Sequence, residues 1–234
     1  MYLSVFHSCH DVERLSDWIR RWYISSSISG NIYYNDGRQN YVQNATFPES
    51  VSNISSVDVS RVDISDRIYW DICHDPSFLI FMHNGVASES VGIFRKFCIA
   101  GNFDYGYQFE VPLTVEDTTD DLILWALGHN GNPFDLTEEV WRDAIEEARY
   151  NRGKIRRIFP VNLLNPSHGP IVEELLKIAT AAERLAGGKT ILTLSQDDIV
   201  MADTISVVRD AALDAVGLEW LDRFDPCGGG PGQM

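Results

Sequence analysis

The chain has 234 residues, with 34 Asp or Glu against 19 Lys or Arg, and a formal net charge of −15 at pH 7. A hydrophobic content of 44% with 11% aromatic residues excludes a disordered chain, because such side chains stay in water only at a cost. The strong negative charge argues against a basic nucleic-acid-binding surface, so no direct nucleic-acid partner is expected.

A short strand and a helix are expected at the start of the chain. Residues 2–7 form a largely apolar run that is typical of a strand. Val12, Leu15 and Ile19 then recur at helical spacing, and the acidic Glu13 near the start of this segment suits a helix N-terminus.

Strand-like runs and turn signals then predict a sheet up to residue 115. Asn35-Asp36-Gly37 predicts a hairpin turn, because Asp-Gly supplies the positive φ that a tight turn needs. Asn84-Gly85 predicts a second hairpin of the same kind. The turns are short, so antiparallel pairing is expected. The strand-like runs cover residues 32–34, 41–42, 68–73, 78–82, 91–99 and 105–113.

Helix start and end signals in residues 116–226 indicate mainly helices. Asp135–Glu138 and Ser195–Asp198 each resemble a capping box that begins a helix. Pro170 suits the first turn of another helix, and Gly187-Gly188 suits its end.

Two strands are also expected among these helices. Residues 155–164 predict a strand at the edge of a sheet, because Pro160 cannot donate to a strand ladder. Residues 190–194 predict a short buried strand that is able to join the N-terminal sheet. The predicted fold class is α+β: a mostly antiparallel N-terminal sheet with one early helix, followed by a helix-rich C-terminal half. The expected parts are a β-rich half at 1–115 and a helix-rich half at 116–226, integrated into one domain, and a flexible glycine-rich tail at 227–234.

Polar side chains near the expected strand ends are the candidate catalytic and metal-binding groups. His with Asp performs acid–base chemistry, and Cys with His binds zinc. The spacings match no familiar metal motif, and polar residues are also ordinary turn formers, so the functional and the structural interpretation both stay open. The catalytic candidates are His10, Asp71, His74, Asp75 and His83, and the metal candidates are His7, Cys9 and His10.

Two basic features are interpreted structurally. Gly187-Gly-Lys-Thr190 resembles a phosphate-binding loop, but that loop needs a glycine where this chain has Glu183, so a helix end before a strand is favoured. The basic run from Arg149 to Arg157 is interpreted as charge at a helix C-terminus that pairs with Glu146 and Glu147, rather than as a phosphate contact.

The excess of acidic over basic side chains is largest in the second half of the chain. Residues 116–234 hold 11 basic and 21 acidic side chains, a net charge of 11 − 21 = −10. Such a surface serves solubility or attracts a basic partner. The candidate binding residues gather near two expected helix starts: Glu116, Asp117, Asp120, Asp121, Asp135, Glu138 and Glu139.

These features favour an acidic, soluble protein-binding module that engages a basic protein partner. One concrete version is a bacterial immunity or inhibitor protein that blocks a basic toxin. The open alternatives are a hydrolase or nuclease that uses the strand-end residues, and a structural subunit of a larger assembly. No secretion signal or membrane-spanning stretch is recognised, so a cytoplasmic protein without cofactor, membrane partner or disulfides is expected.

Overall fold

The computed structural model describes most of the first 110 residues and a continuous segment near the C-terminus. The described residues are 2–25, 32–35, 56–60, 67–71, 78–83, 85–110 and 147–212. The strands are β1 (Tyr2–His7), β2 (Ile32–Asn35), β3 (Ser56–Ser60), β4 (Arg67–Asp71), β5 (Phe78–His83), β6 (Tyr105–Glu110), β7 (Val161–Leu164), β8 (Ala181–Arg184) and β9 (Thr190–Thr193). The α-helices are α1 (Val12–Ser25), α2 (Ala87–Gly101), α5 (Gly169–Leu175), α6 (Gln196–Ala202) and α7 (Ser206–Ala211), and the 3-10 turns are η1 (Arg149–Arg152), η2 (Pro166–His168) and η3 (Ala186–Gly188).

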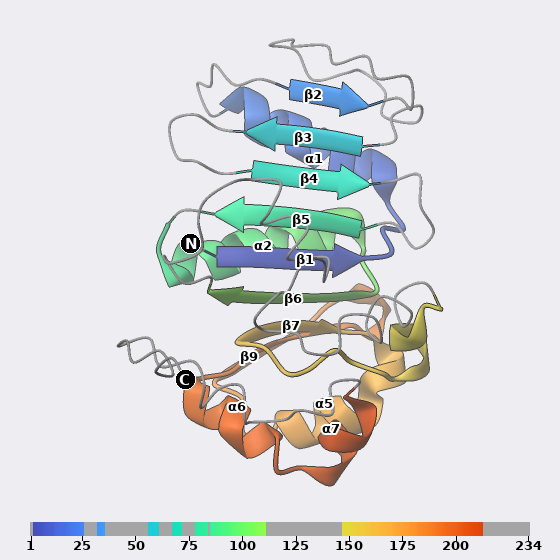
Figure 1. Cartoon of the computed structure of the whole chain (residues 1–234), viewed down its shortest axis with the longest axis vertical. Coiled ribbons are helices and arrows are strands. Elements are labelled where there is room, and N and C mark those ends of the chain that lie inside the picture. The colour runs from blue at the N-terminus through green and yellow to red at the C-terminus, as the bar shows by residue number, and fades with distance from the viewer. Residues whose placement is uncertain are drawn as a thin grey trace, which may run out of the picture.

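One antiparallel sheet contains all of these strands. Their order is β2-β3-β4-β5-β1-β6-β7-β9-β8, so β1 lies in the interior and pairs with β5 on one side and β6 on the other. Figure 1 shows the strands stacked along the long axis of the molecule, with α1 and α2 behind them and the short C-terminal helices at the lower end. The short strand predicted at residues 190–194 is β9, and it joins this sheet, an arrangement that the sequence leaves open.

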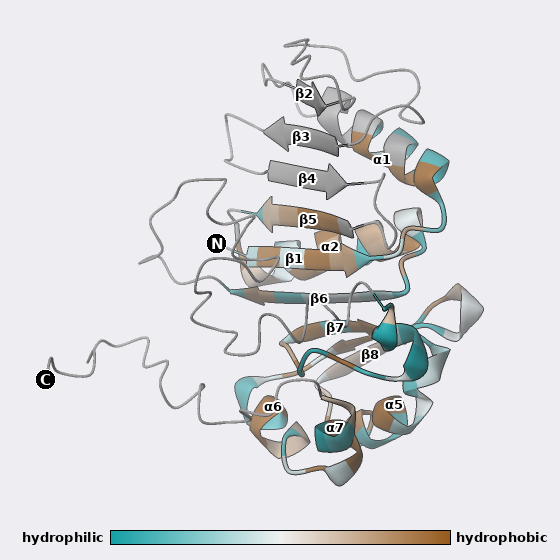
Figure 2. Cartoon of the chain, turned by 45° about the vertical axis from the view of Figure 1, so that its right-hand side comes forward, coloured by the Kyte–Doolittle hydropathy of each residue, from teal (hydrophilic) through white to brown (hydrophobic). Residues whose placement is uncertain are grey.

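Both faces of β1 are buried, because successive side chains of a strand point to opposite faces of the sheet. Leu3 and Val5 lie in the core shared with the tyrosines of β6 and the C-terminal helices, which we call the far-side core. Phe6 lies in the core beneath α1 and α2, the helix-side core, and its ring stacks on Phe94 with 4.8 Å between centroids. Figure 2 shows the matching concentration of apolar residues in β1 and β5.

The sequence correctly predicts mixed α+β structure with an antiparallel sheet. The expected elements at residues 2–7 and from Val12 onward are β1 and α1, and the runs 78–82 and 105–113 correspond to β5 and β6. The capping box at the start of α6 is also confirmed, because Ser195 N donates to Asp198 Oδ2 at 2.8 Å and Asp198 N donates to Ser195 Oγ at 3.2 Å.

The strand predicted over residues 91–99 is wrong, because α2 covers this segment. Phe94 and Phe97 are fully buried at helical spacing and project into the helix-side core. This spacing outweighs the strand preference of the β-branched Val91 and Ile93, since tertiary packing overrides local propensity.

The second predicted hairpin, at Asn84-Gly85, is wrong for the same reason. β5 leads into α2 rather than into a paired strand. Gly85 instead permits a close approach, because a Cβ at this position would lie 2.2 Å from Nε2 of His83.

The predicted helix from Pro170 to Gly188 is wrong beyond Leu175, where α5 ends. The chain then forms β8, which pairs with β9 at the edge of the sheet. Gly187 and Gly188 have φ values of 75° and 76°, so they serve the turn between these two strands instead of ending a helix.

The edge position predicted for residues 155–164 is also wrong. β7 begins at Val161, directly after Pro160, and pairs with both β6 and β9 in the sheet interior. Pro160 does not interrupt this pairing, because its carbonyl oxygen accepts from Leu194 N at 2.8 Å and its missing N–H lies outside the strand.

β3 follows from no pattern recognised in the sequence, and it is the described partner of β2. Residues 41–42, the predicted partner, lie outside the described residues. The described segment 147–212 contains three strands and three short α-helices, so a helix-rich C-terminal half is not shown. The helix expected to begin at Asp135–Glu138 also lies outside the described residues.

Gly106 and Gly92 provide a matched test of the packing around β1. A Cβ at Gly106 would lie 2.9 Å from Phe6 Cδ1 and 3.0 Å from the Val5 carbonyl oxygen, whereas a Cβ at Gly92 would meet nothing within 4 Å. We expect Gly106→Ala to lower the free energy of unfolding by about 1–3 kcal/mol through overpacking. Gly92→Ala should raise it by roughly 0.5–1 kcal/mol, because alanine is the better helix former. Urea denaturation measures both changes, and a neutral Gly106→Ala would contradict the tight packing.

Candidate functional site

The turn after β1 is held against the end of α2 by backbone hydrogen bonds. The amide of His10 donates to the Gly101 carbonyl oxygen at 3.1 Å, and the amide of Asp104 donates to the His7 carbonyl oxygen at 3.1 Å. Ser8 has a φ of 55°, a left-handed conformation that costs energy in a non-glycine residue. These constraints fix the shape of the turn and bring the side chains of His10 and Asp104 together.

A carboxylate lies between an imidazole and an ammonium group at this turn. Asp104 Oδ2 is 2.7 Å from His10 Nε2, and Asp104 Oδ1 is 3.3 Å from Lys189 Nζ. Lys189 Nζ also donates to the carbonyl oxygen and to Oδ1 of Asn102, at 2.8 and 2.9 Å. We call His10, Asn102, Asp104 and Lys189 the β1-end cluster. The His10 side chain is 52% exposed but that of Lys189 only 10%, so the imidazole is the group that solvent reaches.

The β1-end cluster has the parts of a proton-transfer pair. The Asp104 carboxylate accepts a hydrogen bond from Nε2 of His10, which orients the ring and leaves Nδ1 as its basic atom. The neighbouring Cys9 does not add a nucleophile. Its thiol donates to the Gly101 carbonyl oxygen at 3.3 Å, and burial raises the pKa of this thiol to about 12. A thiol that is neutral at pH 7 attacks poorly, so this cluster can hold and move a proton but Cys9 does not supply covalent chemistry.

His7 is part of the far-side face of the sheet rather than of the β1-end cluster. It is 1% exposed, and its ring stacks on Tyr105 and Tyr150 with 6.0 and 5.7 Å between centroids. Burial, with a smaller contribution from the positive charge of Arg156, lowers the pKa of His7 to about 3. The ring is therefore neutral and packed at physiological pH.

The three metal candidates do not form a metal site in the part of the chain that the structure describes. No group of three or more His, Cys, Asp or Glu side chains gathers there in a way that could hold an ion. His7 and His10 lie in different surroundings. The His7 ring is buried among tyrosines, whereas the His10 ring is half exposed beside Asp104.

The strand register separates His83 from the other catalytic candidates. His83 pairs with Tyr2 at the start of β1, whereas His7 pairs with Phe78 at its end. Along a strand, these two positions are about 17 Å apart. The His83 ring is 2% exposed, stacks on Phe81, and has Nε2 3.7 Å from a Glu89 carboxylate oxygen.

Asp71 is at the same end of the sheet as the β1-end cluster. It pairs with Phe78, which in turn pairs with His7, so its backbone is level with the end of β1 two strands away. His74 and Asp75 lie outside the described residues. Asp71 therefore lies at the same end of the sheet as His10, the end where β1 finishes. His83 lies at the opposite end.

Two arginines of the basic run point into the protein. Arg156 is 3% exposed, and its Nη1 donates to the Tyr107 hydroxyl at 2.7 Å. Arg157 is 7% exposed, with its guanidinium 5.8 Å from the centre of the Phe159 ring. At the surface, Arg149 Nε pairs with Glu147 Oε2 at 2.7 Å. The Arg149–Glu147 pair agrees with the predicted acidic partner, whereas Arg156 and Arg157 pack against aromatic side chains instead.

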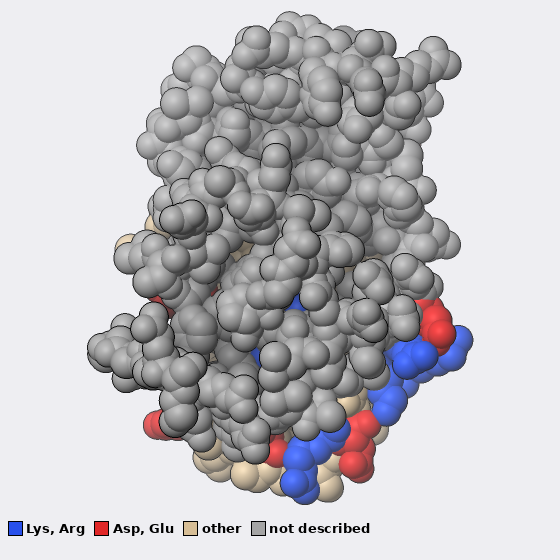
Figure 3. Space-filling model, in the orientation of Figure 1, with Lys and Arg blue, Asp and Glu red and all other residues tan. Residues whose placement is uncertain are grey.

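The seven candidate binding residues between Glu116 and Glu139 all lie outside the described residues. On the face drawn in Figure 3, the described acidic and basic side chains are interspersed along the lower edge. The excess negative charge is therefore not gathered into one patch among the described residues on this face.

Sequence reasoning misses three members of the β1-end cluster. Lys189 belongs to the Gly187–Thr190 segment, whose sequence indicates only a phosphate loop or a helix end. Asn102 and Asp104 follow a segment predicted as a strand, and their spacing matches no catalytic motif. The contact between Lys189 and Asp104 spans 85 positions along the chain, and only the sheet order reveals it.

No protein-family model, curated protein or solved structure matches the chain. Among the described residues, no helix is both long enough and apolar enough to cross a membrane.

The buried His7 predicts that stability falls in mild acid. Its pKa is about 3 in the folded protein and 6.5 when unperturbed, so between these values the unfolded chain binds a proton that the folded protein does not. The full contribution is present above pH 6.5 and is lost as the pH falls, by on the order of 3–5 kcal/mol at pH 3. His7→Phe removes this titration and should flatten the pH dependence of the unfolding free energy. Urea unfolding between pH 4 and 7 tests this, and equal slopes in both proteins would exclude His7 as the cause.

Proposed function

We propose that this protein is a binding module that engages a basic protein partner through acidic side chains of residues 116–139. The observation that carries the proposal is the net charge of −15, of which −10 belongs to residues 116–234. A field of this sign speeds the encounter with a positively charged protein and disfavours acidic competitors. A concrete form of the proposal is an immunity or inhibitor protein that covers the basic surface of a toxin in the cytoplasm.

The histidines and thiols of the described residues support this proposal because the fold itself uses most of them. His7 and His83 are buried beside aromatic rings. The pKa of the buried Cys98 thiol, like that of Cys9, is raised by burial. His7, His83, Cys9 and Cys98 therefore have structural roles and need no catalytic explanation.

A second candidate function is a hydrolase centred on His10 and Asp104. The 2.7 Å contact between the two side chains, with the imidazole half exposed, is the observation that favours it. The two functions differ in what they require of His10. A hydrolase needs this imidazole as a general base, whereas binding through residues 116–139 does not involve it.

Charge reversal tests the binding proposal. Asp120→Lys with Asp121→Lys should slow association with the captured basic partner by on the order of tenfold at low salt, because steering is lost. The difference should shrink as salt screens the charges. Stopped-flow or surface-based kinetics at two salt concentrations measure the association rate constant.

Two control proteins make this test specific. Glu173→Lys with Asp197→Lys changes the net charge by the same amount at two exposed positions outside the proposed surface. This control should slow association much less, and His10→Ala should bind like the parent protein. Equal slowing by both charge-reversal pairs would show that association depends on the net charge of the protein and not on the acidic segment. Loss of binding in His10→Ala would favour a function centred on the β1-end cluster.

A further inference from the structure

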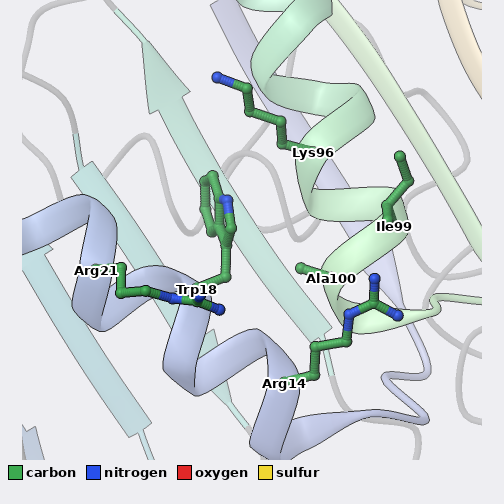
Figure 4. A pocket seen from close by; sticks show the side chains of 6 residues that line it. All are labelled: Arg14, Trp18, Arg21, Lys96, Ile99 and Ala100. Carbon is green, nitrogen blue, oxygen red and sulfur yellow. The ribbon is translucent and has the colours of Figure 1, made fainter.

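The groove between α1 and α2 is lined by cations that do not converge. Arg14 and Arg21 of α1 and Lys96 of α2 lie along it, together with Trp18. Figure 4 shows the Lys96 amine turned away from both guanidinium groups, so these side chains do not enclose a common ligand. A buried group with a defined set of hydrogen bonds lies elsewhere, at η2.

η2 is joined to η1 and to the residues that follow η1 by side chains that bond to backbone atoms. Asn165 Nδ2 donates to the Tyr150 carbonyl oxygen at 3.3 Å, and His168 Nε2 donates to the Lys154 carbonyl oxygen at 3.0 Å. A carbonyl oxygen only accepts, so Nε2 of His168 carries a hydrogen. Of these two side chains, only His168 titrates near neutral pH.

The other ring nitrogen of His168 requires the neutral form. The backbone N–H of Asn165 donates to His168 Nδ1 at 3.2 Å, so Nδ1 presents a lone pair and has no hydrogen. The side chain is buried, and its ring stacks on Tyr105 with 5.8 Å between centroids. A proton on Nδ1 would set two N–H groups against each other in a buried place, which costs free energy because neither then has an acceptor.

No charged side chain among the described residues offsets this cost. Tyr105 faces the ring from β6, and its hydroxyl stays neutral because burial raises its pKa. Tyr150 of η1 shares a hydrogen bond of 2.5 Å with Ser8 Oγ, and Lys154 turns its ammonium group to the Asp210 carbonyl oxygen. The remaining charged side chains on η1, on α5 and at residues 153–157 contact other groups or are exposed: Arg149, Arg152, Arg156, Arg157, Glu173 and Glu174.

The segment that His168 holds in turn holds the end of α7. Lys154 Nζ donates to the Asp210 carbonyl oxygen at 2.7 Å, and Ile155 N donates to the Ala211 carbonyl oxygen at 3.0 Å. Loss of the bond between His168 and the Lys154 carbonyl would therefore loosen both η2 and the last residues of α7.

We propose that His168, the Asn165 amide and the Lys154 carbonyl form an acid-sensitive latch between η2 and the segment that anchors α7. The neutral ring closes this His168 latch through Nδ1 and Nε2. A proton taken from solvent by Nδ1 opens it, because the imidazolium leaves its buried place for water. The latch is independent of the proposed acidic surface, and it would let mild acid loosen the C-terminal helices while the protein stays folded.

The direction of the pH dependence follows from the burial of the ring. Burial lowers the pKa of His168 below its ordinary value of 6.5, to which the pKa returns when the latch opens. The open form therefore binds a proton that the closed form does not, so the latch is most stable above pH 6.5 and weakens as the pH falls. Between pH 7 and pH 5, this linkage limits the rise in the opening constant to about 25-fold.

Native-state hydrogen exchange at pH 7 and pH 5 tests the proposal on the full chain. After correction for the intrinsic pH dependence of exchange, the opening constants of the Asn165 and Ile155 amides should rise about tenfold or more. The rise should persist in His7→Phe, which removes the other buried titration. It should disappear in His168→Asn, because the side-chain oxygen of asparagine accepts a hydrogen bond without titrating.

His10→Asn is the matched control, because it makes the same substitution at a half-exposed histidine, and it should keep the rise. A rise that His168→Asn retains in full would overturn the proposal, as would unchanged opening constants in the parent protein. An equal rise at the Val5 and Phe6 amides would also overturn it, because the opening would then be global.

Nuclear magnetic resonance of the His168 ring adds a test that needs no variant. Long-range proton–nitrogen correlation at pH 7 should show a hydrogen on Nε2 and none on Nδ1. The opposite tautomer, or a cationic ring at this pH, would overturn the proposal, because neither accepts a hydrogen bond from the Asn165 amide.

Discussion

The burial of β1 on both faces is the constraint on which the rest of the described structure depends. Leu3 and Val5 anchor the far-side core, and Phe6 anchors the helix-side core, so one strand joins the two layers of packing. Its neighbours β5 and β6 satisfy its backbone on both edges. Because a one-residue slip would exchange the two sets of side chains, the alternation along β1 sets the register of the central sheet.

This constraint also determines where polar chemistry can occur. Residues within β1 are enclosed, so His7 becomes a neutral ring among tyrosines, with a pKa lowered by burial. Only past the end of the strand does a histidine reach solvent, where His10 meets Asp104 beside the largely buried Lys189. The same two-sided burial needs α2 behind the sheet, where this helix contacts α1.

The sequence predicts the local elements better than their partners. β1, α1 and β5 follow from apolar patterns and turn residues that act within a few positions. The helix α2 is missed because Val91 and Ile93 favour a strand locally, while the contacts that decide the matter come from Phe6 and Phe81 across the core. The β1-end cluster is hidden for the same reason, since Lys189 reaches Asp104 only through the order of strands. Exclusion of His83 from that cluster depends on antiparallel register, which composition and spacing do not encode.

Native-state hydrogen exchange measures the central claim most directly, because it reports the opening free energy of each strand. If β1 joins both cores, the amides of Val5 and Phe6 should exchange only through global unfolding. Their opening free energy should equal the unfolding free energy from denaturant titration. The amides of the edge strand β8, which has exposed side chains at three of its four positions, should exchange through smaller local openings. Exchange of Val5 and Phe6 as fast as that of β8 would contradict the account, because it would show that the sheet opens at β1 without loss of either core.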